Sequence, residues 1–405
     1  MDKLKNKPQL RFPEFKGAWE NKRLGELLEF KNGINATKEQ YGSGIKFINV
    51  LDILNNDYIT HNKIIGSVNV EEDVMKKNQV TYGDILFQRS SETREEVGTA
   101  NVYLDKEKNA TFGGFVIRGK AIVEYNPIFL NKLLKTDLAR DEITSKSGGS
   151  TRYNVGQDTL SSVCLYFPDI PEQQKIASFL SAVDEKIQAL KKKKALLEQY
   201  KKGVMQQIFN QEIRFKDDDG NDYPDWEEKK VGDIVIFTNG KAHENEIDKD
   251  GLYVVVNSKF ISTNGKVRKY SDKNISPLLK NDIVLVMSDV PNGKTLGKCF
   301  LIDRDNKYTL NQRICSLREV NVYNPFLFYI INRNDYYLSF DSGVGQTNLK
   351  KEDVLNCPIV IPISKEEQNK IANFLSAIDD KIVYCQNHID KSELWKKGLL
   401  QQMFV

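Results

Sequence analysis

The sequence predicts an α+β fold: two pseudo-symmetric domains of mixed α/β structure, separated by a pair of long antiparallel coiled-coil helices. Three observations lead to this prediction: a stretch that occurs twice, an apolar stripe along each copy, and matching strand-like runs before each copy. A chain of 405 residues is too long for a single core and suits two domains of about 150 to 170 residues plus helices.

The repeated stretch runs from Glu172 to Phe209 and again from Glu367 to Phe404, 195 positions later. Without a gap, 19 of 38 aligned positions are identical, which indicates duplication rather than similar composition. A repeat unit of this length is a domain plus a connector and not a solenoid repeat. We therefore expect a first domain at 1–170, a first helix at 171–209, a second domain at 210–365 and a second helix at 366–405.

Apolar residues recur in each copy at alternating steps of four and three, which is the pattern of a coiled-coil helix. The only matching stripe in the chain is the other copy, so the two helices are expected to pack on each other. Chain connectivity then requires them to run antiparallel. The predicted helix-pairing residues are Ile176, Leu180, Val183, Ile187, Leu190, Leu197, Val204, Ile208, Ile371, Leu375, Ile378, Ile382, Ile389, Leu399 and Met403.

The helix pair is expected to act as a spacer. At 1.5 Å per residue, each helix is on the order of 55 Å long, so the two domains should lie at opposite ends of a stiff rod. Lys201 and Lys396 are expected to share one layer of the stripe, where a polar residue can set the register. The run Lys191 to Lys194 is interpreted as a solvated face in preference to a phosphate or partner contact.

Each domain opens with the same signals. Arg11-Phe12 in the N-terminal arm has a counterpart in Arg214-Phe215, and both precede a Trp-Glu pair and an Asn-Gly pair that reads as a tight turn. Because Arg214-Phe215 follows the first helix, Arg11-Phe12 should lie just beyond the end of the second helix. The chain termini would then be close together.

The bodies of the two domains diverge in sequence but keep common landmarks. Asn126-Pro127 and Asn324-Pro325 each predict a helix with an Asn cap and Pro in the first turn. Gly/Ser/Thr-rich loops at 147–153 and 342–348 precede the last strand, and loops of this length usually bind something. Strands are expected within 46–50, 83–88, 101–104 and 115–118, and within 252–256, 282–287, 299–302 and 313–317.

The chain carries no recognisable catalytic constellation. It lacks phosphate-binding, zinc-protease, serine-hydrolase and dinucleotide-binding motifs, and its three histidines lie at unrelated positions. The segment Asn324-Pro325-Phe326 resembles the loop with which adenine methyltransferases hold a flipped base, but the second proline is missing. A helix start explains it better. We expect a non-catalytic protein without a metal site.

The cellular location is predicted from three features. No window approaches the 18 apolar residues of a membrane span, and no apolar signal sequence follows Met1. Five cysteines without a C-x-x-C pair indicate reduced thiols in a cytoplasmic protein.

The motif E-Q-x-K-I-A-x-F-L-S-A-x-D-x-K-I, at Glu172 to Ile187 and Glu367 to Ile382, resembles the specificity subunits (HsdS) of type I restriction-modification systems. The resemblance covers essentially the whole chain and includes the Arg-Phe and Trp-Glu signals and the Gly-Ser-Thr or Gly-Gln-Thr loops. One departure is Tyr153-Asn154-Val155, which stands where such loops more often carry Pro-Asn-Leu.

The resemblance implies a non-catalytic reader of double-stranded DNA. Each domain would be a target recognition domain for one half of an asymmetric, interrupted sequence, and the helices would fix the spacer and dock two methyltransferase subunits (HsdM). Restriction-translocase subunits (HsdR) would join them. The resemblance implies no cofactor in this chain, and S-adenosylmethionine, ATP and Mg for the partner subunits. The alternatives are a coiled-coil scaffold with two ligand-binding end domains, and a self-contained methyltransferase, which would need a cofactor site.

Base reading requires Arg, Lys, Asn or Gln on loops that can enter a groove. Four aromatic residues beside the stripe, Phe179, Phe374, Tyr200 and Trp395, are either buried in the helix pair or contact a methyltransferase helix. The predicted DNA-binding residues are Lys31, Asn32, Gln88, Arg89, Arg94, Arg152 and Tyr153 in the first domain, and Asn239, Lys241, Lys259, Lys294 and Gln346 in the second.

Overall fold

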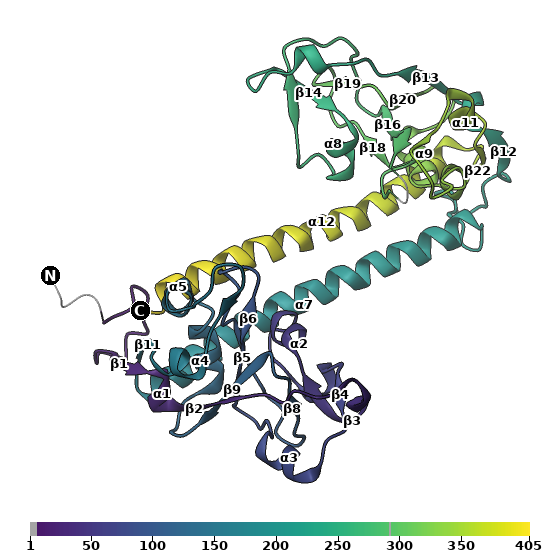
Figure 1. The fold of residues 1–405 in the computed structure, drawn as a ribbon. Coiled ribbons are helices and arrows are strands. Elements are labelled where there is room, and N and C mark those ends of the chain that lie inside the picture. The colour runs from purple at the N-terminus through teal and green to yellow at the C-terminus, as the bar shows by residue number, and fades with distance from the viewer. Residues whose placement is uncertain (1–5, 291–292) are drawn as a thin grey trace. The chain divides into compact units, whose positions relative to one another are not determined.

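The computed structural model of the protein describes residues 6–290 and 293–405, and it divides the chain into two compact units (Figure 1). Unit 1 comprises 1–192 and 386–405, and unit 2 comprises 193–385. Each unit is α+β, as predicted, and each contains the start of one long helix and the end of the other.

Unit 1 is built on an antiparallel four-stranded sheet of order β2-β9-β5-β7 and a mixed three-stranded sheet of order β4-β3-β8. Two short ladders, β1-β11 and β6-β10, complete it. The strands are β1 (Glu20–Arg23), β2 (Leu28–Asn32), β3 (Tyr41–Ile48), β4 (Ser67–Val68), β5 (Ile85–Gln88), β6 (Ser90–Ser91), β7 (Ala100–Val102), β8 (Thr111–Phe112), β9 (Val116–Ala121), β10 (Tyr153–Asn154) and β11 (Cys164–Phe167). Its short helices are α1 (Leu24–Leu27), α2 (Val50–Leu54), α3 (Glu72–Lys77), α4 (Pro127–Leu133), α5 (Asp137–Ser145) and α6 (Gln157–Ser161).

Unit 2 repeats this plan strand for strand, with sheets of order β13-β20-β16-β18 and β15-β14-β19 and the ladders β12-β22 and β17-β21. All eight strands predicted from the sequence exist. The strands of unit 2 are β12 (Glu227–Lys230), β13 (Val235–Asn239), β14 (Tyr253–Val256), β15 (Lys269–Ser271), β16 (Ile283–Val286), β17 (Ser288–Asp289), β18 (Cys299–Leu301), β19 (Tyr308–Leu310), β20 (Ile314–Glu319), β21 (Thr347–Asn348) and β22 (Pro358–Ile361). Its short helices are α8 (Ser258–Ser262), α9 (Asn324–Ile331), α10 (Asp335–Leu338) and α11 (Lys351–Leu355).

The two Asn-Pro helices begin differently. In α4, Asn126 Oδ1 accepts hydrogen bonds from Ile128 N and Phe129 N, both over 3.0 Å, which confirms the predicted cap. In α9 the predicted Asn cap is wrong, because Asn324 is the first residue inside the helix. Its buried side chain donates instead to the carbonyl oxygens of Asn281 and Leu317. Tertiary contacts therefore displaced a local capping signal.

The long helices are α7 (Ile170–Phe209) and α12 (Lys365–Gln402). In unit 1 the beginning of α7 shares a hydrophobic core with the end of α12, and in unit 2 the end of α7 shares one with the beginning of α12. The core members are Ile176, Leu180, Val183, Ile187, Leu399 and Met403 in unit 1, and Val204, Ile208, Ile371, Leu375 and Ile378 in unit 2. Ile389 is also buried, whereas Leu190, Leu197 and Ile382 are half-buried.

Ion pairs give the direction of the helices. In unit 1, Lys191 contacts Glu393 and Asp184 contacts Lys396, so positions that descend along α7 meet positions that ascend along α12. The two segments therefore run antiparallel. The expectation that Lys201 and Lys396 share a layer is wrong: Lys396 Nζ pairs with Asp184 in unit 1, and Lys201 Nζ pairs with Asp379 in unit 2, each over 2.6 Å. In an antiparallel pair of repeated helices, a position near the end of one helix lies opposite a position near the start of the other. Equivalent positions of the two copies therefore face each other only at the middle of the helices.

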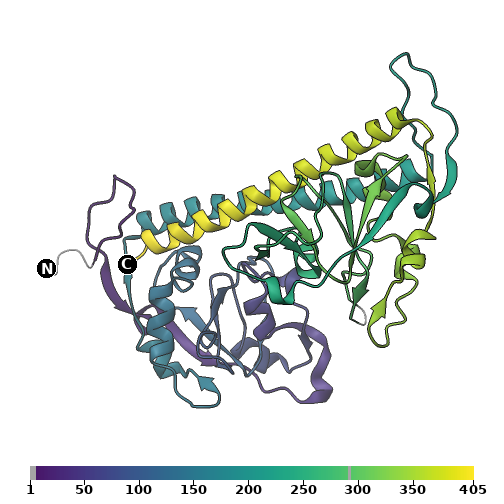
Figure 2. The ribbon, with the colours of Figure 1, turned by 90° about the horizontal axis from the view of Figure 1, so that it is seen from above.

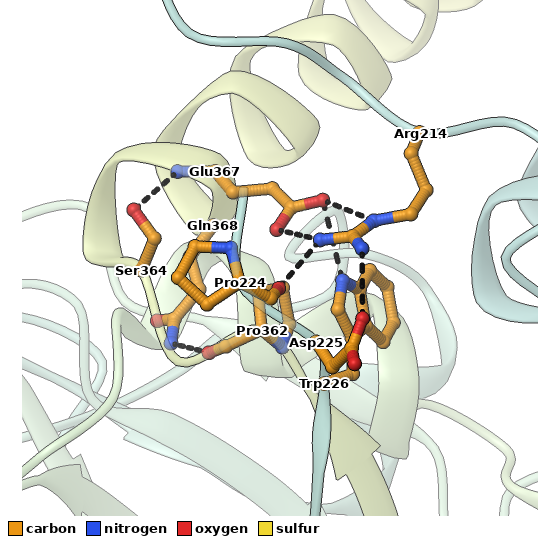
Figure 3. Close-up of polar contacts among 8 residues, drawn as sticks. All are labelled: Arg214, Pro224, Asp225, Trp226, Pro362, Ser364, Glu367 and Gln368. Carbon is orange, nitrogen blue, oxygen red and sulfur yellow. Dashed lines mark hydrogen bonds and ion pairs between the residues drawn. The ribbon is translucent and has the colours of Figure 1, made fainter. Parts of the chain in front are cut away.

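The glutamate of the Glu-Gln pair that opens the second repeat anchors the entry segment of unit 2 (Figure 3). Glu367 is fully buried, and its carboxylate accepts hydrogen bonds from Arg214 Nε (3.2 Å), Arg214 Nη2 (3.0 Å) and Trp226 Nε1 (3.2 Å). Gln368 Nε2 donates to Pro362 O over 2.8 Å. The Arg-Phe and Trp-Glu signals thus meet the start of the helix that closes the same domain.

Unit 1 contains the equivalent arginine–glutamate contact, formed by the N-terminal arm. Arg11 donates two hydrogen bonds of 2.7 Å to the buried carboxylate of Glu172. Leu10 N donates to Gln402 O over 2.9 Å, so Arg11-Phe12 lies beside the end of α12 within unit 1 (Figure 2). The predicted position of the arm is confirmed.

The aromatic residues beside the stripe fall into two kinds. Phe179 packs edge-on against Phe12, and Phe374 packs in the same way against Phe215, each with ring centroids 5.7 Å apart. Tyr200 and Trp395 remain 54% and 50% exposed. Phe179 and Phe374 therefore belong to the arm contacts. Trp395 packs edge-on against Phe179, with ring centroids 6.1 Å apart, and the other part of its side chain is exposed.

No helix within the described part of the chain combines the length and apolar character needed to cross a bilayer. All five cysteines are free, and all but Cys164 are buried.

Candidate nucleic-acid interface

The four-stranded sheet of unit 1 ends in a set of connected turns. Because β2, β9 and β5 are antiparallel neighbours, the end of β2, the start of β9 and the end of β5 lie at the same edge of the sheet. We call residues 32–35, 89–91, 113–115 and 152–155 the turn cluster of unit 1. The hydrogen bonds that connect it run from Gly33 N to Val116 O (3.1 Å), from Arg89 N to Phe115 O (2.9 Å) and from Val155 N to Arg89 O (3.0 Å).

Unit 2 has the same set of turns at the same edge of its sheet. Its turn cluster comprises residues 239–241, 287–289, 311–313 and 346–349. The corresponding hydrogen bonds run from Gly240 N to Ile314 O (3.0 Å), from Met287 N to Arg313 O (3.0 Å) and from Leu349 N to Met287 O (2.7 Å). Each of these three backbone bonds therefore has its equivalent in the other cluster.

The Asn-Gly pairs, predicted as tight turns, lie inside these clusters, but their glycines lack the left-handed conformation that is common in such turns. Neither Gly33 nor Gly240 has a positive φ. The glycine is required by a close approach of two chain segments: a Cβ on Gly33 would lie 2.2 Å from Gly113 O, and a Cβ on Gly240 would lie 1.9 Å from Asn311 O. Glycine thus holds the first and third turns of each cluster together.

Four of the predicted DNA-binding residues of unit 1 belong to its turn cluster. Asn32, Arg89 and Arg152 are exposed, and Tyr153 is half-buried. Arg89 Nη1 donates to Gly114 O over 3.4 Å, so this arginine also supports the neighbouring turn. Arg152 contacts Glu92 at 4.0 Å, and both side chains are largely exposed. Such a surface pair is weak, so the arginine can exchange it for an anionic ligand.

Three predicted residues of unit 1 lie outside the cluster. Arg94 is exposed in the adjoining loop, where its Nε donates to Thr144 O over 3.3 Å. Lys31 is half-buried on β2, and its Nζ donates to Lys77 O over 2.7 Å. Gln88 is only 4% exposed and donates to Ser90 O. A base-reading side chain must reach into a groove, so the structure argues against a DNA contact by Gln88.

In unit 2, Asn239, Lys241 and Gln346 belong to the turn cluster and are exposed. Gln346 Nε2 donates to Ser288 Oγ over 2.5 Å, which links the fourth turn to β17. Lys259 is exposed near the start of α8, outside the cluster; the preceding strand β14 ends at Val256, whose carbonyl oxygen accepts a hydrogen bond from Asn311 N. Lys294 is exposed in the loop after β17.

The loop that carries Lys294 is organised by an acid. Asp289 Oδ2 accepts hydrogen bonds from Thr295 N (2.6 Å) and Leu296 N (3.1 Å). Burial opposes ionisation of this carboxyl, but the hydrogen bonds from Thr295, Val290 and Leu296 outweigh it and lower the pKa of Asp289. The Asp289 carboxylate is therefore held in its ionised form by the loop that it organises.

Sequence reasoning missed two residues of the clusters, Phe115 and Arg313. Phe115 is 64% exposed in the third turn of unit 1, and Arg313 is exposed at the equivalent position of unit 2. Both were included in predicted strands, within 115–118 and 313–317, although the strands begin one residue later at Val116 and Ile314. The alternation of apolar and polar residues does not locate the end of a strand to within one residue. Here a shift of one residue determines whether a side chain is exposed or buried.

The family of the protein follows from its sequence profile. Residues 16–199 and 223–391 each match the type I restriction modification DNA specificity domain. The two matched segments cover most of the chain. The chain belongs to this family of specificity subunits.

Curated relatives agree with this assignment. The specificity subunit is 28% identical over 245 residues to the type I restriction enzyme MjaIX specificity subunit of Methanocaldococcus jannaschii, an alignment that spans 56% of this chain and 54% of that protein. It is 22% identical to the putative MjaX specificity subunit of the same organism, over 96% of this chain and 93% of that one. The StySPI specificity subunit of Salmonella potsdam is 23% identical over 74% of this chain and 68% of its own length.

Solved structures share the fold of this specificity subunit. The S subunit of a type I restriction-modification system from M. genitalium superimposes with a TM-score of 0.62 at 16% identity, over 98% of this chain and 99% of that one. A chain from a study of complex assembly and conformational transition of the type I R-M system gives a TM-score of 0.55 at 16% identity, over 97% and 99%.

Proposed function

We propose that each unit of this specificity subunit binds one half of a bipartite double-stranded DNA target through its turn cluster. The observation that carries the proposal is a common backbone frame with different side chains. Arg89, Phe115 and Arg152 in unit 1 stand where Met287, Arg313 and Gln346 stand in unit 2. A frame of this kind suits two readers that approach DNA in the same way but recognise different sequences.

The exposed side chains of the clusters have the chemistry that base reading needs. Arginine binds guanine with two donors, and Asn or Gln binds adenine with a donor and an acceptor. The whole chain has a formal charge of only +3, so bulk attraction to phosphate is weak and local contacts must supply most of the affinity. We therefore expect binding that depends strongly on sequence and less strongly on salt.

The long helices are proposed to set the spacer between the two half-sites. At 1.5 Å per residue, a helix of 40 residues such as α7 is about 60 Å long, which is enough to separate two major-groove contacts on one face of B-DNA, about 34 Å apart. Tyr200 and Trp395 are equivalent positions of the two repeats and are both exposed. We propose that these faces dock two methyltransferase subunits.

The chemistry of the complex is assigned to its partners. The methyltransferase subunits (HsdM) would use S-adenosylmethionine to methylate adenine N6, and restriction-translocase subunits (HsdR) would use ATP and Mg. The specificity subunit is proposed to bind none of these cofactors and to act by positioning the DNA target for its partners. A scaffold with two ligand-binding ends is the competing function, and it predicts no preference among duplex sequences.

Replacing Arg152 by alanine is expected to weaken binding to the first half-site by about 5- to 100-fold, because one charged or bidentate base contact contributes about 1–3 kcal/mol. The measurement is the affinity of the subunit, assembled with its methyltransferase partners, for duplexes altered in one half at a time. Lys120→Ala is the matched control, since Lys120 is exposed near the opposite end of β9. Equal loss on unrelated DNA would reassign Arg152 to a phosphate contact.

A further inference from the structure

We infer that the residue just before β9 in unit 1 and β20 in unit 2 determines sequence specificity, and that Arg313 at this position contacts the edge of a base, guanine by preference, in the half-site of unit 2. The inference deepens the proposed function and rests on it. Arg313 is not predicted by the residue pattern; the structure alone brings it to the cluster.

The equivalence of the two positions is set by backbone hydrogen bonds. The carbonyl oxygen of Phe115 accepts from Arg89 N over 2.9 Å, and the carbonyl oxygen of Arg313 accepts from Met287 N over 3.0 Å. The residue that follows each of them accepts from the Asn-Gly glycine of the first turn. Two neighbouring turns therefore fix the backbone at this position in both units.

The backbone of Arg313 adopts an unusual conformation. Its φ is +67°, in the left-handed region that residues with a Cβ seldom occupy. A conformation of this kind costs on the order of 1 kcal/mol and persists only where surrounding contacts impose it. Met287 N holds one side of the turn, and Gln312 N, which donates to Lys241 O over 3.0 Å, holds the other. The arginine is thus mounted on a constrained backbone.

The guanidinium of Arg313 is available to a ligand. It makes no hydrogen bond or ion pair with any of residues 6–290 or 293–405, and the residue is exposed. Two other arginines of unit 2 have acidic partners: Arg318 pairs with Asp282 over 2.7 Å, and Arg304 contacts Asp303 at 3.6 Å. The exposed amide of Asn239 in the first turn offers a further donor and acceptor to the same ligand.

The difference between Phe115 in unit 1 and Arg313 in unit 2 favours base reading over phosphate binding at this position. A side chain used only to bind the DNA backbone would need a donor in both units, and the Phe115 side chain has none. An apolar side chain can contact a thymine methyl group, whereas the forked donors of arginine match O6 and N7 of guanine. A change of this kind at one fixed position is what two different half-sites require.

The test uses the full-length subunit assembled with its methyltransferase partners, with the wild-type target first defined by the positions of methylated adenines. Arg313→Ala is expected to lower discrimination at one base pair of the second half-site by about 10- to 100-fold, with the first half-site unchanged. Arg313→Gly should give the same result while accommodating the positive φ, so that a folding defect of the alanine variant cannot explain it. Arg304→Ala is the control, an exposed arginine at the opposite edge of the sheet.

The outcomes are distinct. Loss of discrimination at one position in both Arg313 variants supports the inference, and a corresponding relaxation in the first half-site for Phe115→Ala extends it to unit 1. Equal weakening on target and random duplexes would make Arg313 a phosphate contact and overturn the inference, as would unchanged discrimination. If the wild-type complex shows no bipartite preference, the proposed function itself fails, independently of Arg313.

Discussion

Replacing Glu367 by alanine is expected to lower the free energy of unfolding by about 3–5 kcal/mol, the usual consequence of removing one partner of a buried ion pair. Glu367 is fully buried, and its carboxylate is the shared acceptor for Arg214 and Trp226 (Figure 3). Without it, the Arg214 guanidinium and the indole N–H both lose a partner that water cannot fully replace. Chemical denaturation of the full chain measures the loss.

The adjacent residue provides a matched control. Glu366 is exposed and forms a 3.3 Å ion pair with Lys370, one turn along α12, so Glu366→Ala should change stability much less than Glu367→Ala. The double variant Arg214→Ala with Glu367→Ala should lose less stability than the sum of the losses in the two single variants. Each single variant leaves one charged group without its partner, whereas the double variant leaves none. Equal effects of Glu366→Ala and Glu367→Ala would contradict the anchoring role of this contact.

Asp184→Ala is expected to be similarly destabilising, by about 3–5 kcal/mol. The Asp184 carboxylate forms ion pairs with Lys132 and Lys396, and the Lys132 side chain is only 4% exposed. Removal of the acid leaves the buried Lys132 ammonium without its counter-charge. Glu185→Ala, at the next and exposed position of α7, is the control for helix propensity and net charge.

Acid titration supplies a second readout for the same residue. Burial opposes ionisation of Asp184, but hydrogen bonds and charge interactions with Lys132 and Lys396 outweigh it and lower its pKa. A carboxyl whose pKa is lower in the folded state stabilises the fold above its unfolded pKa, near 3.9, and this contribution is lost as the pH falls through the folded value. The wild type should therefore lose more stability than Asp184→Ala between about pH 5 and pH 2. Parallel stability curves would contradict this assignment.

The helices and the arm were predictable because their signals are local and repeated. An apolar stripe of period 3.5 over more than four heptads indicates a coiled-coil helix. Because Arg214-Phe215 follows the first helix, its counterpart Arg11-Phe12 could be placed beside the end of the second helix without knowledge of the domain structure. The layer of Lys201 and Lys396 was predicted wrongly because the two copies were aligned in parallel, whereas antiparallel packing gives each lysine an aspartate of the other helix.

The candidate interface was only partly predictable. Arg89 and Arg152 could be predicted as DNA-binding residues from residue type and loop composition. Gln88 and Arg313 could not be assigned correctly, because their exposure depends on the exact residue at which a strand ends or begins. Gln88 is the last residue of β5 and is buried, whereas Arg313 precedes β20 and is exposed. The backbone hydrogen bonds that fix these strand ends join segments distant in the sequence, so no local sequence pattern predicts them.

The central claim is that each unit reads its own half of one DNA target. The most direct test maps N6-methyladenine across the genome in cells that carry the wild-type complex, and in cells whose subunit has alanine at Asn239, Lys241, Arg313 and Gln346. The account predicts a bipartite motif for the wild type, and for the variant a motif whose second half is degenerate while the first half and the spacer are kept. Degeneracy in both halves, or an unchanged motif, would contradict it.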